Sequence, residues 1–444
     1  MTTVAGTTAV LVAFLALLRL NRAAALAGFF VLFSLLTRTA ALTYVDLAGP
    51  IYAVELEDDV GGGPSMPLFA TAVLAFIVPL AMLFRPSRLK VLLRSVRATS
   101  IVHRGLVNLV LVLVSLFVIA LYIDMFWRET IPLFQGIDRL DYNRDMAGPI
   151  HPFVFDFGFL LATLIGTMMV YPRVRGREFD FRFLAIYVAV ITYYALTGNR
   201  FSAFYSFTSF FVIPIAAVPM LAQIGYLPPA PRRRTLVARV LVARTTVIVA
   251  ISLLGLALAG LLAYNLTSVR GYDDPAEQFL QRSVVQPVQL WWMTWHSLSE
   301  RSTDAGLAWD AAFLNPLDPT RNTSIQALMI KNLGGARASE LLDNGQQYAG
   351  GYPEILFELL GPSAALAVAL AFGIASAWLL RLIVLSVARG HLLTGVLATY
   401  VFFGFSLLYI GGMLNFLLAW TFWVKCFALA VAAYLENFRS SRLS

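Results

Sequence analysis

The sequence predicts an all-α polytopic membrane protein, and three features of the chain support this fold class. Of the 444 residues, 59% are hydrophobic and only 13% are charged, a balance typical of a membrane-embedded chain. The apolar residues gather in segments near the roughly 20 residues that an α-helix needs to cross about 30 Å of hydrocarbon. The loops between these segments sort their charges by sign, as expected for a chain that crosses a membrane repeatedly.

About eleven transmembrane helices are predicted from the apolar segments. The first is predicted to be a retained span rather than a cleaved signal, because no basic residue precedes it and Arg19 and Arg22 follow it. The predicted spans lie near residues 4–18, 23–45, 67–84, 105–127, 152–171, 183–198, 201–225, 247–268, 362–385, 392–410 and 413–435.

The charge of the loops predicts the orientation of these spans. Loops that alternate along the chain hold 21 Lys and Arg residues against three acidic residues, whereas the other loops hold about twice as many acidic as basic residues. Short cytoplasmic loops are the ones enriched in Lys and Arg. The N-terminus is therefore predicted to lie outside and the C-terminus in the cytoplasm, with all spans in a bacterial inner membrane. The formal net charge of +8 is assigned to topology and to anionic membrane lipids rather than to nucleic acid.

One long extracytoplasmic loop, residues 269–360, interrupts the regular succession of spans. Asp274 followed by Pro275 predicts a helix start, and a second helix is predicted from Thr323 to Asn332. Trp291, Trp292 and Trp295 are typical of a segment at the membrane interface. We therefore expect a lid of interfacial helices over the outer mouth of the bundle.

Two ionisable residues lie inside predicted spans, where charge is costly and commonly functional. Arg38 and Asp156 lie at comparable depths below the outer ends of their spans. We expect them to pair and to shape the floor of an outward-facing cavity. An ion pair with a purely structural role, or an arginine whose side chain extends to the membrane interface, explains them equally well.

Three arginines lie on the outer side, where the charge pattern disfavours them: Arg200, Arg270 and Arg282. Each is at or near the outer end of a span. Guanidinium groups bind phosphate oxygens in a bidentate manner, so the three residues are predicted to hold a lipid diphosphate. Pairing with acidic residues of the loops is the alternative.

Three features of the chain resemble the O-antigen polymerase (Wzy) family and related oligosaccharide repeat-unit polymerases. They are Gly198-Asn199-Arg200 at an outer junction of two spans, a large late external loop that opens with arginines, and the segment 350–361 that returns from this loop to a span. The agreement in span number and loop placement covers most of the chain.

The resemblance implies a glycosyltransferase of the GT-C class that acts without a metal ion or other cofactor. Such an enzyme transfers a growing glycan from an undecaprenyl-diphosphate donor to a sugar hydroxyl on a second lipid-linked repeat unit. Its partners would be these lipid-linked oligosaccharides and a chain-length regulator protein. Arginines can stabilise the leaving diphosphate, and His296 or Glu354 would be the general base. Tyr352 would stack on a sugar ring.

A ligase that joins the glycan to a different acceptor, such as a lipid core or a protein, uses similar chemistry and is one alternative. Two other functions also fit parts of the sequence. The acidic residues Glu55, Glu57, Asp58 and Asp59 of the first outer loop would suit a metal-dependent GT-C glycosyltransferase that uses polyprenyl-monophosphate sugars. A lipid-linked oligosaccharide transporter or flippase is the second alternative, but transporters place polar groups near the midplane and show repeated halves. No phosphate loop, nucleophile elbow or dinucleotide fingerprint is present in the sequence.

Overall fold

The computed structural model describes residues 1–94, 104–137, 141–199, 201–227, 274–300, 306, 323–343 and 350–442. The chain forms two compact units. Unit 1 consists of Met1–Thr99, Leu280–Ser386 and His391–Ser444, and unit 2 consists of Ser100–Phe279 and Val387–Gly390.

The protein is an all-α polytopic membrane protein, as the sequence predicted. Within the described residues, eight helices are long and apolar enough to cross a membrane. They are Thr2–Leu20, Phe29–Ala48, Met66–Leu83, Arg104–Gln135, His151–Val174, Ser202–Gln223, Glu354–Arg389 and Leu392–Gly411. The apolar helix Arg182–Leu196 is shorter, and the predicted span 247–268 lies outside the described residues. The number eleven therefore stays a prediction.

The N-terminal helices of unit 1 are α1 (Thr2–Leu20), α2 (Arg22–Ala27), α3 (Phe29–Ala48), α4 (Met66–Leu83) and α5 (Pro86–Arg94). The predicted span 23–45 is two helices, α2 and α3, which meet at Gly28. A Cβ at Gly28 would lie 2.5 Å from Leu80 Cδ2, so the absence of a side chain lets α4 approach closely. Asn21 caps α2 by accepting a hydrogen bond from the Ala24 amide.

A small antiparallel hairpin lies in the first loop, which contains the acidic residues considered for the metal-dependent alternative. Its strands are β1 (Ile51–Ala53) and β2 (Asp58–Val60), with Ile51 opposite Val60. Gln281 of the predicted long loop holds the hairpin, because its Nε2 donates a 2.7 Å hydrogen bond to the Tyr52 carbonyl.

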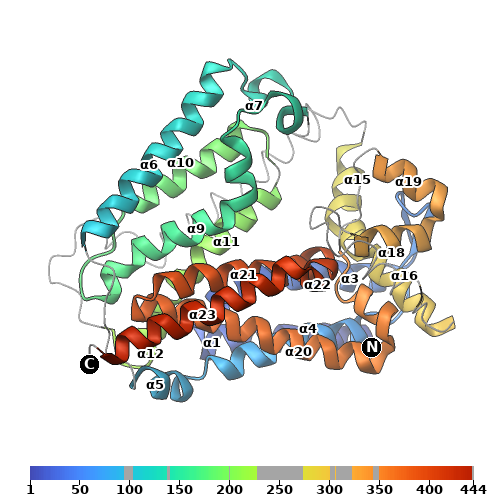
Figure 1. Ribbon diagram of the computed structural model, residues 1–444. Coiled ribbons are helices and arrows are strands. Elements are labelled where there is room, and N and C mark those ends of the chain that lie inside the picture. The colour runs from blue at the N-terminus through green and yellow to red at the C-terminus, as the bar shows by residue number, and fades with distance from the viewer. Residues whose placement is uncertain are drawn as a thin grey trace. The chain divides into compact units, whose positions relative to one another are not determined.

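The C-terminal helices of unit 1 are α20 (Glu354–Arg389, whose last three residues belong to unit 2), α21 (Leu392–Gly411), α22 (Asn415–Leu418) and α23 (Trp420–Arg442). Gly361 has φ 70° and breaks α20 immediately before Pro362, so a short helix that starts at Glu354 precedes the predicted span 362–385. Ala419 is extended and separates α22 from α23, which interrupts the predicted span 413–435. Helices α21 and α23 run side by side (Figure 1), with the Phe405 and Phe422 rings 5.7 Å apart.

Several shorter helices form a layer at the outer ends of the unit 1 spans, meaning the ends that the charge pattern assigns to the outside. They are η3 (Gln281–Val285, a π-helix), α16 (Gln286–Glu300), α18 (Thr323–Leu333) and α19 (Gly335–Asp343). Helix α15 (Pro275–Leu280) precedes η3, and Asp274 caps it by accepting hydrogen bonds from the Ala276 and Glu277 amides, as predicted. The predicted second loop helix is also present as α18.

This outer layer packs on the spans through specific contacts. The Trp291 ring of α16 lies 5.5 Å from Phe69 in α4 and 5.2 Å from Phe357 in α20. Helix α18 is joined to the segment before α22 by a hydrogen bond from the Leu414 amide to Ser324 Oγ. The predicted long loop is thus ordered against the bundle in these segments.

Gly351 lies where the chain returns from the outer layer to the spans. It has φ 116°, and an added Cβ would lie 2.7 Å from Ile325 Cδ1 and 2.8 Å from the Gly411 carbonyl oxygen. We expect Gly351→Ala to lower the free energy of unfolding by about 1–3 kcal/mol, because both backbone strain and overpacking oppose the methyl group. Thermal unfolding of the purified protein in detergent measures the change.

Gly335→Ala is the matched control, since no atom lies within 4 Å of a Cβ built at Gly335. Its effect should stay within about 0.5 kcal/mol. Equal stability of the two variants would contradict the close approach at Gly351.

Unit 2 contains α6 (Arg104–Trp127), α7 (Pro132–Gln135), η1 (Tyr142–Met146), α9 (His151–Val174), α10 (Arg182–Leu196), α11 (Phe201–Ile215) and α12 (Ala217–Gln223). Helices α9 and α11 approach closely, because a Cβ at Gly166 would lie 2.3 Å from the Phe211 carbonyl oxygen. Aromatic rings join α10 to α11, with Tyr187 and Phe211 stacked at 4.3 Å.

Candidate functional site

The predicted site residues divide between the described and undescribed parts of the chain. Arg200 and Arg270 lie outside the described residues. Asp156 belongs to α9 of unit 2 and is exposed. The other predicted residues lie in unit 1, and they form two separate groups there: Arg38, Tyr352 and Glu354 in the interior, and Arg282 and His296 on η3 and α16.

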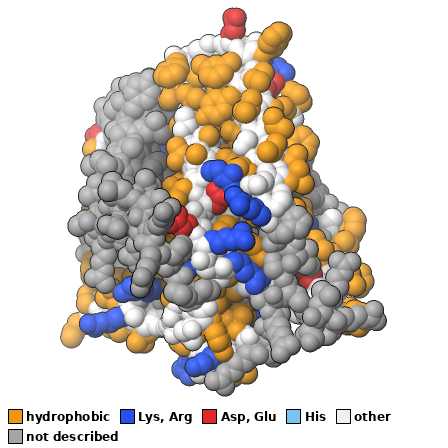
Figure 2. Space-filling view, turned by 90° about the vertical axis from the view of Figure 1, so that its left-hand side faces the viewer, with side chains coloured by type: hydrophobic (Ala, Val, Ile, Leu, Met, Phe, Trp, Pro, Cys, Tyr) orange, Lys and Arg blue, Asp and Glu red, His pale blue; other side chains and the backbone are white. Residues whose placement is uncertain are grey.

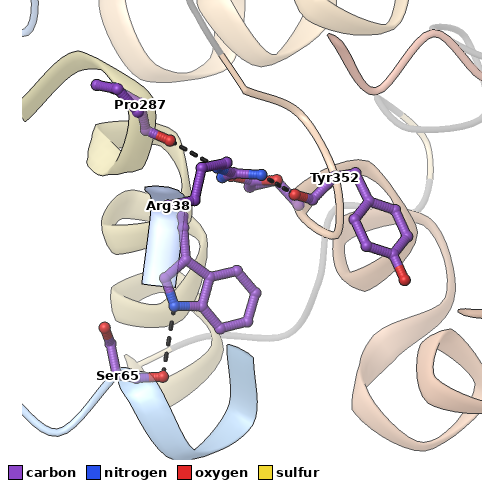
Figure 3. A network of polar contacts seen from close by, with 6 residues as sticks. Arg38, Ser65, Pro287 and Tyr352 are labelled. Atoms are coloured by element: carbon purple, nitrogen blue, oxygen red, sulfur yellow. Dashed lines mark hydrogen bonds and ion pairs between the residues drawn. The ribbon is translucent and has the colours of Figure 1, made fainter. Parts of the chain in front are cut away.

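The guanidinium group of Arg38 is enclosed by protein atoms from three segments of unit 1 (Figure 3). Its Nε donates a 2.8 Å hydrogen bond to the Pro287 carbonyl of α16, and its Nη1 donates to the Tyr352 carbonyl. Its Nη2 forms an ion pair with Glu354 at the start of α20. The Phe69 ring lies 5.2 Å from the guanidinium carbon. Arg38 therefore joins α3, α16 and α20.

The Arg38–Glu354 pair differs from the predicted pairing of Arg38 with Asp156. Both members of the observed pair are almost inaccessible, with side chains 4% and 0% exposed. A buried charge must be paired, and the depth of Arg38 in its span did not reveal that Glu354, more than three hundred residues later, lies at the same level. The carboxylate of Glu354 is consequently a poor candidate for a base that must reach a substrate.

Tyr352 is likewise part of the interior rather than the wall of a cavity. Its side chain is fully buried, its hydroxyl donates a 3.2 Å hydrogen bond to the Ala72 carbonyl, and its ring lies 4.7 Å from that of Tyr409. The structure thus differs from the predictions that Tyr352 stacks on a sugar and that Arg38 lines a cavity floor.

A second polar group, which we name the Glu55 cluster, consists of Glu55, Arg282, Gln286 and Gln289. Gln286 Nε2 donates a 2.7 Å hydrogen bond to Glu55 Oε1, and Gln289 Nε2 donates a 2.5 Å hydrogen bond to Glu55 Oε2. Burial raises the pKa of Glu55, while the Gln289 hydrogen bond and the positive charge of Arg282 oppose this increase. The cluster lies outside the spans, at the tip of the β1–β2 hairpin.

His296 belongs to the same helix as this cluster. Gln286, Gln289 and His296 are separated by three and seven residues within α16, a spacing that repeats on one face of an α-helix. Arg282 precedes them in the π-helix η3. At 1.5 Å per residue, His296 lies about 10 Å along the axis beyond Gln289. It is exposed on α16. This polar face of η3 and α16 thus consists of two carboxamides and an imidazole on α16 and of the Arg282 guanidinium, which acts on Glu55 from η3.

The acidic residues of the hairpin do not gather around a common point. Glu55 faces the glutamines, whereas Glu57 forms a 3.1 Å ion pair with Arg337 of α19. Asp58 and Asp59 are exposed on β2. No group of three or more His, Cys, Asp or Glu side chains suited to a metal ion occurs in the part of the chain that the structure describes. The geometry does not favour the metal-dependent alternative.

The pH dependence of hairpin docking provides a test of the Glu55 cluster. Because the pKa of Glu55 is raised above its ordinary value of 4.5, the docked hairpin binds the proton more tightly than the undocked one. This contribution to docking is complete below about pH 4.5 and is lost as the pH rises through the raised pKa. Protection of the Val54 amide, which donates to Gln281 Oε1, should therefore fall with rising pH. Hydrogen exchange measures it, and Glu55→Gln should remove the pH dependence.

Glu57→Gln is the control for that experiment, since the Glu57 side chain is 62% exposed. The control should keep the pH dependence of the wild type. A flat wild-type profile would contradict the burial of the Glu55 carboxylate.

Comparison with known proteins gives one match. Residues 318–425 match a family described as of unknown function (DUF6418). The matched segment contains α18 to α22 and the start of α23, and so includes Tyr352 and Glu354 but neither Arg38 nor the Glu55 cluster. No curated protein and no solved structure matches the chain.

Sequence reasoning missed the glutamines of the Glu55 cluster and assigned Glu55 only to a possible metal site. The signal was available in the spacing of Gln286, Gln289 and His296, which places three polar groups on one helical face. The docking of the hairpin on this face had no comparable signal in the sequence.

Proposed function

We propose that the protein polymerises undecaprenyl-diphosphate-linked oligosaccharide repeat units at the outer leaflet of a bacterial inner membrane, for O-antigen, capsule or exopolysaccharide. The observation that supports this function best is the polar face of η3 and α16, which lies in the layer at the outer ends of the spans. It carries Arg282 near the carboxamides of Gln286 and Gln289, which bind Glu55, and His296 about 10 Å further along the axis. A lipid-linked diphosphate presents phosphate and sugar groups at this depth.

Arg282 is the described member of the proposed diphosphate clamp. A guanidinium group can bind two phosphate oxygens at once and stabilise the charge that develops on a leaving diphosphate. The same charge opposes the increase that burial causes in the pKa of Glu55, so Arg282 acts electrostatically on this outer surface. Arg200 and Arg270 complete the clamp in this proposal, on the evidence of the sequence alone.

His296 is the proposed general base, because Glu354 is buried and paired with Arg38. In the reaction, the acceptor hydroxyl loses its proton to the imidazole as its oxygen forms a bond to the anomeric carbon of the donor glycan. The bond between that carbon and the phosphate oxygen breaks, and undecaprenyl diphosphate leaves with the electron pair. The imidazole has the proton affinity suited to this step near neutral pH.

Reconstitution tests the proposed function directly. Purified protein in liposomes with synthetic undecaprenyl-diphosphate repeat units should yield longer lipid-linked glycans and one released undecaprenyl diphosphate per bond formed. Chromatography and mass spectrometry detect both products. Translocation of the lipid without bond formation would indicate a transporter, and loss of polymerisation upon chelation would indicate the metal-dependent class. His296→Ala should reduce the turnover rate about 10²-fold or more.

A further inference from the structure

Unit 2 contains a cavity that the proposed polymerase reaction does not use. It has a volume of about 610 Å³, and its lining includes Arg104, Arg175, Arg177, Arg182, Glu178 and Asp180. Figure 2 shows basic side chains gathered on this face of the molecule, with acidic side chains beside them. The cavity lies between the start of α6, the end of α9 and the start of α10.

Two of the charged side chains in this cavity neutralise each other. Arg182 forms a 2.6 Å ion pair with Asp180 and also donates to Asn108 Oδ1. The hydrogen bond from Arg182 lowers the pKa of Asp180, so this carboxylate stays ionised and is committed to its partner. The remaining charges are three arginines against the exposed Glu178, which leaves an excess of positive charge.

None of the three remaining arginines forms a salt bridge with an acidic residue in the described part of the chain, and the charge of Arg104 contributes only a small part of the lowered pKa of Asp180. Arg175 donates to the Tyr171 hydroxyl and to the Arg389 carbonyl, both at 3.2 Å. These acceptors are neutral, so they orient the guanidinium and leave its charge uncompensated. The side chains of Arg104 and Arg177 form no salt bridge with other described residues, and both are exposed.

The cavity lies at the ends of apolar helices. Arg104 is the first residue of α6, Arg182 is the first residue of α10, and Arg175 follows the last residue of α9. The apolar helices therefore end at the level of the arginines, where lipid headgroups lie. Val107 and Phe179 give the cavity an apolar wall as well, which suits a ligand that is part lipid and part anion.

We propose that this cavity binds the phosphate group of an anionic phospholipid from the adjacent leaflet. Guanidinium groups match phosphate geometry, and basic pockets between transmembrane helices bind anionic headgroups. A soluble phosphate ion offers the same anionic chemistry but would gain nothing from the apolar wall. The charge pattern of the loops places this leaflet on the cytoplasmic side.

Lipid competition on the full-length protein tests the proposal. Nanodiscs containing phosphatidylglycerol and phosphatidylcholine supply the lipids, and native mass spectrometry of the released protein counts the lipids retained. We expect preferential retention of phosphatidylglycerol, and a loss of roughly fivefold in relative affinity for each of Arg104→Ala and Arg177→Ala. Because both side chains are exposed, these variants should fold.

Arg144→Ala is the matched control, since Arg144 is an exposed arginine of unit 2 that pairs with Asp141 and Asp145. It should retain phosphatidylglycerol as the wild type does. Equal retention by the Arg104→Ala and Arg177→Ala variants would overturn the proposal. In a second arm, displacement of the lipid by millimolar inorganic phosphate would overturn the phospholipid assignment, whereas resistance to phosphate supports it.

Discussion

Replacing Arg38 by alanine is expected to lower the free energy of unfolding by about 3–5 kcal/mol, a large fraction of the stability of most proteins. The substitution leaves the Glu354 carboxylate, whose side chain is 0% exposed, without its cationic partner. It also removes the donors that satisfy the Pro287 and Tyr352 carbonyls. Thermal unfolding in detergent, followed by fluorescence, measures the change.

Double substitution separates the cost of an unpaired charge from the value of the pair. Replacing Arg38 with Met and Glu354 with Leu removes both charges, and this variant should be more stable than Arg38→Ala because apolar residues can replace a buried pair at small cost. Arg128→Ala provides a comparison at an exposed pair, with Asp124, where the expected loss is below about 1 kcal/mol. Wild-type stability of Arg38→Ala would show that Glu354 does not depend on this cation.

Replacing Arg282 by alanine is expected to reduce glycan polymerisation about 10²-fold while leaving the protein folded. The proposed role of this guanidinium is to stabilise charge on the departing diphosphate, and removal of one such donor commonly costs 10²–10³ in rate. Arg282→Lys keeps the positive charge but loses bidentate binding, so its rate should be intermediate. Turnover by reconstituted protein, together with polymer length in a complemented deletion strain, measures both variants.

Arg337→Ala is the control for Arg282, because it removes an arginine of the same outer layer that pairs with Glu57 and Glu340. Its polymer ladder should match that of the wild type. A normal ladder from Arg282→Ala would remove this residue from the proposed clamp and leave the reconstitution assay as the test of polymerisation.

Hydropathy and helix-capping residues were sufficient to predict the fold class and several helix ends. The Asp274 cap and helix α18 illustrate this, since both depend on neighbouring residues. The breaks within the predicted spans were harder to predict from the sequence. Gly28 lies between α2 and α3 and lets α4 approach closely, and that contact comes from tertiary structure rather than from local preference.

The candidate site shows the same division between local and distant information. The polar face from Gln286 to His296 follows from helical spacing, although the sequence reasoning did not use it. The partner of Arg38 could not be found in that way, because Asp156 and Glu354 both lie at a plausible depth and only folding selects between them. Likewise, the position of Tyr352 near a span end did not indicate that its ring packs against Tyr409.

The separation of Arg38 and Glu354 along the chain has a consequence for synthesis of the protein. The two residues are 316 positions apart, and at about 5–20 residues per second a ribosome needs about 15–60 s to cover that distance. Helix α3 must therefore enter the bilayer long before its counter-ion exists, at a depth where an isolated cation is strongly disfavoured. Until the ribosome has synthesised Glu354, we expect an insertase, or water that penetrates the bilayer, to solvate the Arg38 guanidinium.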